Sequence, residues 1–274
     1  MATAVRAFPW ARIAVGLWLT LAVGVVVAAA AGWPLPGALA AALGLLLVST
    51  VGVGVFHAQL GLFARPIVAA DPREAGDRIA LTFDDGPEPG TTEQVLALLR
   101  ARGHRATFFV IGRRAEAARG LARQIVREGH GLANHSFAHR PATPFLRPRV
   151  LAAELAQAEA LLGALRGEAP AGPWFRAPVG IVSPRVAEAA RLAGLELVGW
   201  TASARDGTRR MTVDRALARL RPCLRPGAIL VLHDGVEGAD RRPIAPVLLA
   251  RLLDELDARK LRSVTLDELL GGPR

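Results

Sequence analysis

From Arg78 to the end of the chain, short apolar runs alternate with segments whose apolar residues recur at helical spacing. This alternation predicts βα units with a parallel sheet. The number of runs indicates an α/β fold, a distorted and partly closed (β/α) barrel, and such barrels carry their chemistry at the C-terminal ends of the strands. The expected strands are 79–83, 106–111, 132–134, 174–175, 195–200, 228–232 and 262–266.

Two adjacent carboxylates follow the first expected strand. The apolar run 79–83 ends at Asp84 and Asp85, and Gly86 and Pro87 forbid its continuation. Neighbouring carboxylates repel each other unless a cation or a proton relieves one of them. A plain turn is the alternative interpretation, because Asp, Gly and Pro all favour turns. A functional interpretation of the two aspartates is therefore supported only if other strand ends supply partners for them.

The third expected strand leads into His135, and His139 lies four residues later. On a helical turn this spacing puts both imidazoles on one face, close enough to bind a single cation. One aspartate from the first strand end completes a set of one oxygen and two nitrogen donors, which suits Zn²⁺ or a similar divalent ion. Histidines four apart also arise by chance, so the pair alone is a weak signal.

Arg176 and His233 each follow a later expected strand. Arg176 comes after the run 174–175, and His233 comes directly after the run 228–232. An arginine cannot lose its charge, so beside Asp84 it would act as a permanent counter-ion. The plain interpretations are a solvated arginine and a histidine in a turn. Both residues nevertheless fall where a (β/α) barrel places its functional groups.

Two uncharged apolar segments precede this region. Residues 13–32 contain no charge and span roughly 30 Å as a helix, which matches the hydrocarbon thickness of a bilayer. Residues 38–56 form a second such segment after a break at 33–37. Together they predict a membrane hairpin within residues 1–64, with transmembrane helices at about 13–32 and 38–56.

The arginines around this hairpin predict its orientation. Arginines precede and follow it, whereas the loop between the two segments has none. The positive-inside rule then places both ends in the cytoplasm. This predicts a two-pass protein of the inner (cytoplasmic) membrane with its remaining domain on the cytoplasmic face. A cleaved signal peptide is the alternative for the first segment, although the second segment would then still return the chain to the cytoplasm. An extracytoplasmic domain requires either that the second segment fails to span or that the N-terminus starts outside.

Charge and composition limit the partners. Residues 65–77 are expected to form a linker, and residues 78–270 one domain. The net charge of +10 suits an anionic partner such as lipid headgroups, a diphosphate-linked substrate or nucleic acid. No basic stripe is interleaved with aromatic residues and tyrosine is absent, so no nucleic-acid partner is expected. Cys223 is the single cysteine, which excludes an intrachain disulfide. The oligomeric state stays open.

Four strand-end motifs occur in a fixed order and spacing: Thr82–Pro87, His135–His139, Arg176–Gly180 and Val231–Asp234. This set resembles the NodB-type polysaccharide deacetylases of the fourth carbohydrate esterase family, over about residues 78–266. The membrane hairpin lies outside the resemblance. The resemblance implies metal-dependent hydrolysis of an N-acetyl, or related N-acyl, group on an amino sugar of a polysaccharide or a lipid-linked glycan.

The resemblance also implies the metal site. Its ligands would be Asp85, His135 and His139, with Zn²⁺ as the leading metal and Co²⁺ or Ni²⁺ as alternatives. A bound divalent ion can lower the pKa of its water from 15.7 to roughly 7 and polarise the amide carbonyl.

The remaining roles follow from the same resemblance. Asp84 would be the general base and Arg176 would hold it, while His233 would be the general acid. The backbone N–H of Val179 would help to hold the oxyanion. Substrate contacts are expected to extend to the neighbours of these residues, Pro178 and Val231.

One motif departs from the family. The family usually carries Asp-x-x-Asp-Trp in its fourth motif, whereas Ser203–Gly207 keeps only the second aspartate, Asp206. Asp206 can still orient His233 and raise its pKa. Gly207 in place of tryptophan predicts a lower wall of the groove and favours a larger or lipid-linked substrate. A catalytically silent carbohydrate-binding relative is the alternative that this departure supports, and a membrane-tethered nucleic-acid binder rests on charge alone.

Overall fold

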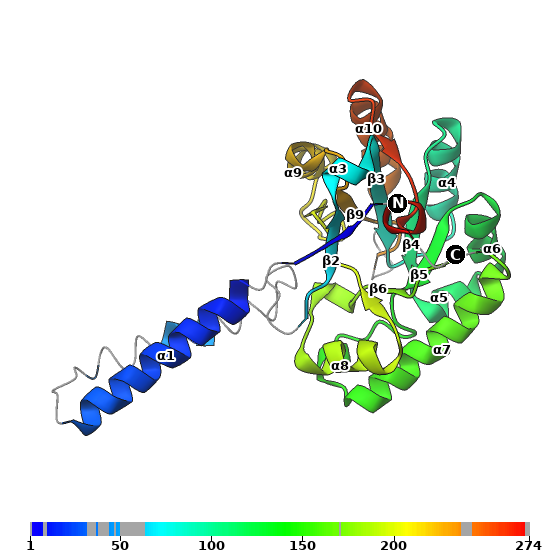
Figure 1. Cartoon of the computed structure of the whole chain (residues 1–274). Helices are drawn as coiled ribbons and strands as arrows, with labels where there is room; N and C mark the ends of the chain where they lie inside the picture. Colours follow the sequence, from blue (N-terminus) through cyan, green and yellow to red (C-terminus); the bar gives the residue numbers. More distant parts are fainter. Residues whose placement is uncertain are drawn as a thin grey trace.

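The computed structural model shows a curled parallel sheet surrounded by helices (Figure 1). It describes residues 2–7, 10–31, 37, 44–46, 48–49, 64–169, 171–236 and 243–271. Within them the main sheet has eight strands in the order β7-β6-β5-β4-β3-β9-β8, and β10 pairs with the first residues of β3. The strands are β3 (Arg78–Asp84), β4 (Ala106–Val110), β5 (Gly131–Asn134), β6 (Trp174–Phe175), β7 (Glu196–Leu197), β8 (Ala202–Ser203), β9 (Ile229–His233) and β10 (Arg262–Ser263).

Every pairing in this sheet is parallel, so all strands deliver their C-terminal ends to the same edge. β3 lies at the centre, between β4 and β9, and its last residue, Asp84, aligns with His233 at the end of β9. This register places the residue types singled out from the sequence side by side. The expected partly closed (β/α) arrangement is therefore confirmed as a curled half-barrel.

Helices cover the outer face of the sheet and bury its main core. That core joins side chains of β3, β4 and β9 with α4, α6, α9 and α10, and Phe83 and Phe108 stack at its centre with ring centroids 5.0 Å apart. A separate cluster is formed by α7 and α8 with β6. The helices of the body are α4 (Thr92–Ala101), α5 (Gly112–Ala117), α6 (Arg119–Arg127), α7 (Pro148–Arg166), α8 (Pro184–Leu192), α9 (Val213–Leu220), α10 (Ala245–Ala258) and α11 (Leu266–Leu270).

A second core cluster joins side chains of β3, β4 and β9 that alternate with those of the main core to a strand that the sequence did not reveal. β2 (Ile67–Ala70) bridges to Val198 on one side of the barrel and to Ala228 on the other. It lies, with the short helix α3 (Pro72–Ala75), in the segment 65–77 that is predicted to be a linker. The segment is ordered because its backbone groups complete hydrogen bonds that the curled sheet leaves open.

Residues before the apolar segment also join this domain. β1 (Ala4–Arg6) pairs antiparallel with β2, and the N–H of Ala2 donates to the carbonyl of Leu269 at 3.1 Å. α1 (Trp10–Ala30) follows and extends away from the body (Figure 1). Several of its apolar side chains, such as Leu17 and Val23, are exposed.

The described part of the chain contains no helix with the length and hydropathy that crossing a membrane requires. The predicted second transmembrane segment, 38–56, lies mostly outside the described residues. The hairpin therefore stays a prediction.

Candidate active site

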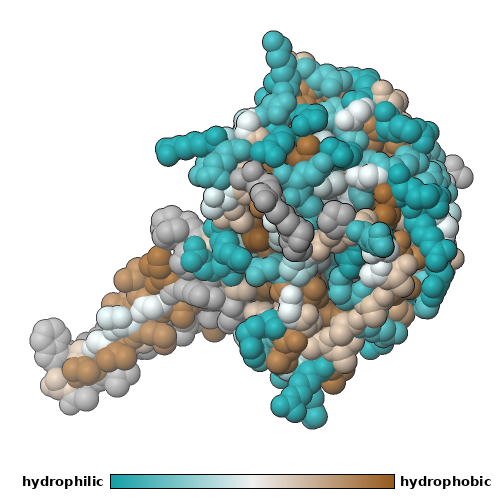
Figure 2. Space-filling view, turned by 45° about the vertical axis from the view of Figure 1, so that its right-hand side comes forward, coloured by the Kyte–Doolittle hydropathy of each residue, from teal (hydrophilic) through white to brown (hydrophobic). Residues whose placement is uncertain are grey.

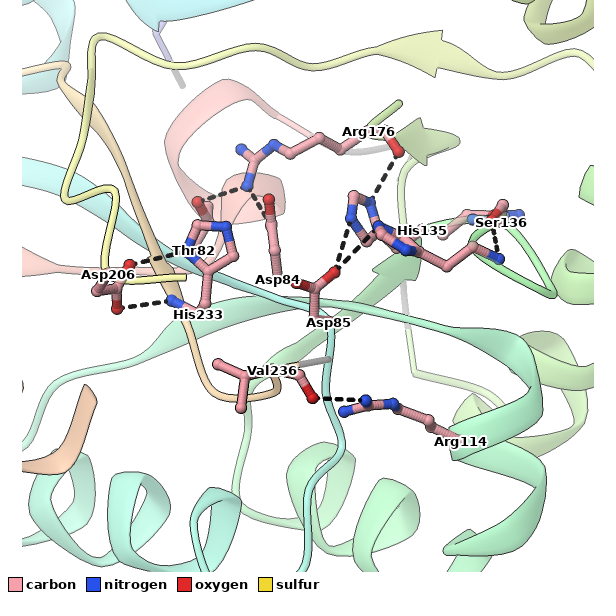
Figure 3. A network of polar contacts seen from close by, with 12 residues as sticks. Thr82, Asp84, Asp85, Arg114, His135, Ser136, Arg176, Asp206, His233 and Val236 are labelled. Carbon is pink, nitrogen blue, oxygen red and sulfur yellow. Dashed lines mark hydrogen bonds and ion pairs between the residues drawn. The ribbon is translucent and has the colours of Figure 1, made fainter. Parts of the chain in front are cut away.

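Six polar side chains converge at the C-terminal edge of the sheet (Figure 3). Each comes from a strand end or from the loop that follows it, as the barrel architecture requires. They line or border a cavity of about 730 Å³. The six residues are Asp84, Asp85, His135, His139, Arg176 and His233.

Asp85, His135 and His139 form a compact donor set. The Nε2 atom of His135 lies 3.3 Å from Oδ1 of Asp85, and the Nε2 atom of His139 lies 3.2 Å from the same oxygen. One ligand atom from each of the three lies within 4.8 Å of the other two. Oδ1 of Asp85 is buried and has no hydrogen-bond partner among the described residues, although it faces two imidazoles. An orphaned carboxylate oxygen that faces two ring nitrogens is the environment of a divalent cation.

The tautomer of His135 fits the same interpretation. Its Nδ1 lies 2.9 Å from the carbonyl oxygen of Arg176, which can only accept, so Nδ1 carries the proton. In the neutral imidazole, Nε2 is then the nitrogen with the lone pair, and it lies toward Asp85. The Asp-His-His set thus fits a metal ion by donor chemistry and by the bond that orients one ligand.

The pKa of Asp85 is held well below its usual range. Burial by itself raises this pKa, but the contact with His135 and the charges of the nearby imidazoles outweigh it.

Asp85 and His139 both have positive φ, at 71° and 49°. Positive φ is uncommon for residues other than glycine, and such local strain gathers at functional sites.

The route by which the two histidines meet differs from the prediction. The segment 135–139 forms no helical turn. Instead, the N–H of Ser136 donates to the side chain of Asn134 and the N–H of His139 donates to the hydroxyl of Ser136. These turns bring the ring centroids of His135 and His139 to 5.1 Å. The two histidines therefore lie close together, as predicted, but not on the predicted helical turn. Hydrogen bonds from the backbone to side chains replace that turn.

Asp84 is held by a buried arginine. Nη1 of Arg176 donates to Oδ1 of Asp84 at 2.6 Å and to the Thr82 hydroxyl at 2.8 Å, and Nη2 donates to the carbonyl of Gly199 at 3.0 Å. The guanidinium also lies 4.0 Å from the ring centroid of Phe109. Burial lowers the pKa of Arg176, and Asp84 opposes that shift. These hydrogen bonds hold Asp84 next to the Asp-His-His donor set, but Asp84 is not a member of that set.

His233 is bound to Asp206. Its Nδ1 lies 2.7 Å from Oδ1 of Asp206, and its backbone N–H donates to Oδ2 of the same carboxylate at 3.0 Å. Burial lowers the pKa of His233, but the charge and hydrogen bond of Asp206, with smaller contributions from Asp84 and Asp85, raise it to about 9. His233 therefore carries a proton at neutral pH, and Nε2 is the nitrogen left to donate it.

The expected substrate contacts are only partly at the cavity. Val179 and Val231 line it, whereas Pro178, the first residue of the η3 turn (Pro178–Gly180), is buried and does not. Val179 is 66% exposed and has φ of 53°, and its N–H makes no hydrogen bond within the described part of the chain. A β-branched residue rarely adopts this conformation, and such local strain gathers at functional sites.

The sequence did not reveal several other contributors. Trp200 lines the cavity and lies over Arg176, with 5.9 Å between the guanidinium carbon and the ring centroid. Thr82 accepts from Arg176, and Arg114 donates to the carbonyl of Val236 in the loop after β9 (Figure 3). Only their position after or within an apolar run distinguishes these residues in sequence, and that signal is too common to use.

An Asp-His-His donor set beside an arginine-bound aspartate and an aspartate-bound histidine is typical of a metal-dependent hydrolase. Comparison with known families matches residues 71–198 to polysaccharide deacetylase. The chain is 38% identical to a chitooligosaccharide deacetylase of Bradyrhizobium sp. (strain ANU 289) over 166 residues, which covers 60% of this chain and 74% of the relative.

Two further relatives extend the match. A peptidoglycan-N-acetylglucosamine deacetylase of Bacillus cereus is 34% identical over 200 residues, 70% of this chain and 87% of the relative. The structure of a family 4 acetyl xylan esterase from Clostridium thermocellum, in complex with a cobalt ion, superposes with a TM-score of 0.62 at 29% identity, covering 70% of this chain and 89% of that one. The chain belongs to the polysaccharide deacetylase family.

Proposed function

We propose that this protein hydrolyses the N-acetyl, or a related N-acyl, group of an amino sugar in a glycan. The proposal depends on one observation: two adjacent aspartates have different partners at the same cavity. Asp85 faces His135 and His139, whereas Asp84 is bound by Arg176 and lines the same cavity. A binding protein needs a donor set or a cavity, but not a second carboxylate held apart from the set. The similarity to two N-acetyl-glycan deacetylases supports the same reaction.

Asp85, His135 and His139 would hold the metal, for which Zn²⁺ is the first choice and Co²⁺ or Ni²⁺ the alternatives. One oxygen and two nitrogen donors leave open positions, as in catalytic rather than structural zinc sites. When bound, such an ion supplies Lewis acidity toward water and the amide carbonyl.

The chain's own residues supply the proton transfers. Asp84 accepts a proton from the attacking water, because Arg176 fixes its carboxylate at the cavity. His233 donates a proton to the departing amine, since its raised pKa keeps it protonated at neutral pH. The unpaired N–H of Val179 stabilises the oxygen on which negative charge develops.

The test is release of acetate or formate from a panel of acetylated glycans and lipid-linked sugars by the purified protein with added Zn²⁺. Asp84→Asn is expected to abolish hydrolysis while the protein still binds metal. Asp77→Asn, an exposed aspartate just before β3 that does not line the cavity, is the matched control and keeps full activity. Full activity in Asp84→Asn refutes the assignment. Binding of glycan without hydrolysis by the wild-type protein favours a silent carbohydrate-binding relative.

We also propose that residues 8–63 attach the protein to the inner membrane as a hairpin, with the catalytic domain on the cytoplasmic face and a lipid-linked glycan as a substrate. Figure 2 supports attachment, because the face of α1 that it shows is mostly hydrophobic while the visible face of the body is mostly hydrophilic. The pairing of β1 with β2 brings both ends of the segment to one place. A reporter fused after Arg274 that is active only outside the cell would contradict this orientation.

A further inference from the structure

One wall of the catalytic cavity carries positive charge that no acidic side chain of the described residues neutralises. The cavity is lined on that side by Arg205 and Arg219, together with Ser203, Gly207 and Thr208. Neither arginine forms an ion pair within the described residues, and Nε of Arg219 donates only to the carbonyl of Ser203, at 3.3 Å. Two guanidinium groups thus border the cavity that contains the reaction centre.

The surrounding sequence strengthens this charge. Residues 203–219 contain five arginines and two aspartates. Both aspartates are already engaged: Asp206 binds His233, and Asp214 binds Arg251. Neither of these carboxylates is therefore available to neutralise the cavity wall, which stays positive at its rim.

Arg205 is also held in an unusual conformation. Its φ is 55°, a left-handed value that favours glycine. The N–H and hydroxyl of Thr208 both bond to the carbonyl of Arg205, and the N–H of Arg205 donates to the hydroxyl of Ser203. Asp206, the next residue, is anchored by His233. The backbone that carries Arg205 is thus tied to the proposed general acid, and its side chain begins from a fixed point at the cavity.

We propose that Arg205 and Arg219 bind an oxyanion carried by the substrate next to the reacting amino sugar, either a phosphate ester or a carboxylate. The inference rests on the proposed deacetylation and adds the substrate class to it. A guanidinium donates paired hydrogen bonds that match phosphate and carboxylate oxygens. Gly207 leaves this side of the cavity without a side chain, so the anion can reach the arginines past His233. The cavity volume, about 730 Å³, is large enough for a ligand beyond a single acylamino group.

The test compares one glycan in three forms: a neutral N-acetylated chito-oligosaccharide, the same oligosaccharide with a terminal phosphate ester, and the same with a terminal carboxylate. Equilibrium binding and the kcat/KM for acetate release are measured for each. The wild-type protein is expected to prefer an anionic form by about tenfold or more in both measurements. The form preferred identifies the oxyanion. Raising the salt concentration should reduce the preference.

Arg205→Gln and Arg219→Gln are expected to lose about tenfold in kcat/KM on the anionic form while the neutral form changes less than about twofold. Arg123→Gln, an exposed arginine on α6 with the same loss of charge, is the control and keeps the preference. Equal binding of all three forms by the wild-type protein overturns the proposal, whether or not they are hydrolysed. Absence of hydrolysis together with a retained anion preference refutes deacetylation and leaves the anion site standing.

Discussion

The Asp206–His233 pair offers the sharpest quantitative prediction. The pKa of His233 is raised from 6.5 to about 9, chiefly by the charge and hydrogen bond of Asp206 acting against burial. At about 1.36 kcal/mol per unit, this difference corresponds to about 3 kcal/mol in favour of the protonated imidazole. At pH 8 about nine-tenths of the protein then carries the proton that the departing amine needs.

Asp206→Asn removes the charge but keeps the shape. The side-chain oxygen can still accept from the backbone N–H of His233, and its NH₂ group then faces Nδ1 of the imidazole. An amide donor favours an unprotonated Nδ1, so the pKa of His233 is expected to fall to about 6.5 or below. The protonated fraction at pH 8 then drops to about one-thirtieth, and kcat/KM should fall about thirtyfold at that pH.

The assay is the pH profile of kcat/KM for acetate release, together with an NMR titration of His233. We expect the alkaline limb to move from about pH 9 in the wild-type protein toward 6.5 in Asp206→Asn, with near-normal activity restored at low pH. Because the folded pKa is raised, the pair stabilises the fold fully below about pH 6.5 and ceases to do so as the pH passes 9. An alkaline limb that does not move would refute the role given to Asp206.

Three other changes test the site and its support. Replacing Arg176 by Met leaves a buried carboxylate unpaired and should lower the free energy of unfolding by about 3–5 kcal/mol in urea titrations, whereas Arg123→Met on the surface should leave it within about 0.5 kcal/mol. Zn²⁺ at a hundredfold excess over its Kd should raise the free energy of unfolding of the wild-type protein by about 2.7 kcal/mol. The same Zn²⁺ should not stabilise His135→Ala, and thermal unfolding measures both. Gly86→Ala should reduce both stability and bound zinc, because a Cβ there would overlap the buried carboxylate of Asp234; unchanged unfolding would show that the loop can shift.

The sequence predicted those parts of the fold in which each apolar run has a clear end. The run that ends in two aspartates became β3, and the run that ends before His233 became β9, and both are central strands of the sheet. Parallel pairing then forces their ends together, so the predicted proximity of Asp84, Asp85 and His233 needed no tertiary information. Helix boundaries were also predictable where Ser183 and Pro184 begin α8.

Short strands could not be predicted in the same way. β8 has two residues and β2 four, and neither shows a periodic apolar pattern that distinguishes it from a loop. The helical stretch from Gly112 to Arg127 is interrupted at Ala118, which leaves the helical region with φ of −117° and ψ of 47°. Such features depend on contacts with distant segments, which override local propensity.

β1 shows most clearly what requires the whole structure. Its three residues carry no signal of a strand in sequence, yet they pair with β2, some 60 residues later, and Arg6 forms an ion pair with Glu196 of β7 at 2.7 Å. An exposed pair contributes little energy alone, so the position of β1 depends on the backbone ladder and on the burial of Ala2 and Ala7. Because β1 and β2 are neighbours, the segment between them must leave the domain and return to the same place. Any membrane that this segment enters therefore has the N-terminal strand and the catalytic cavity on the same side.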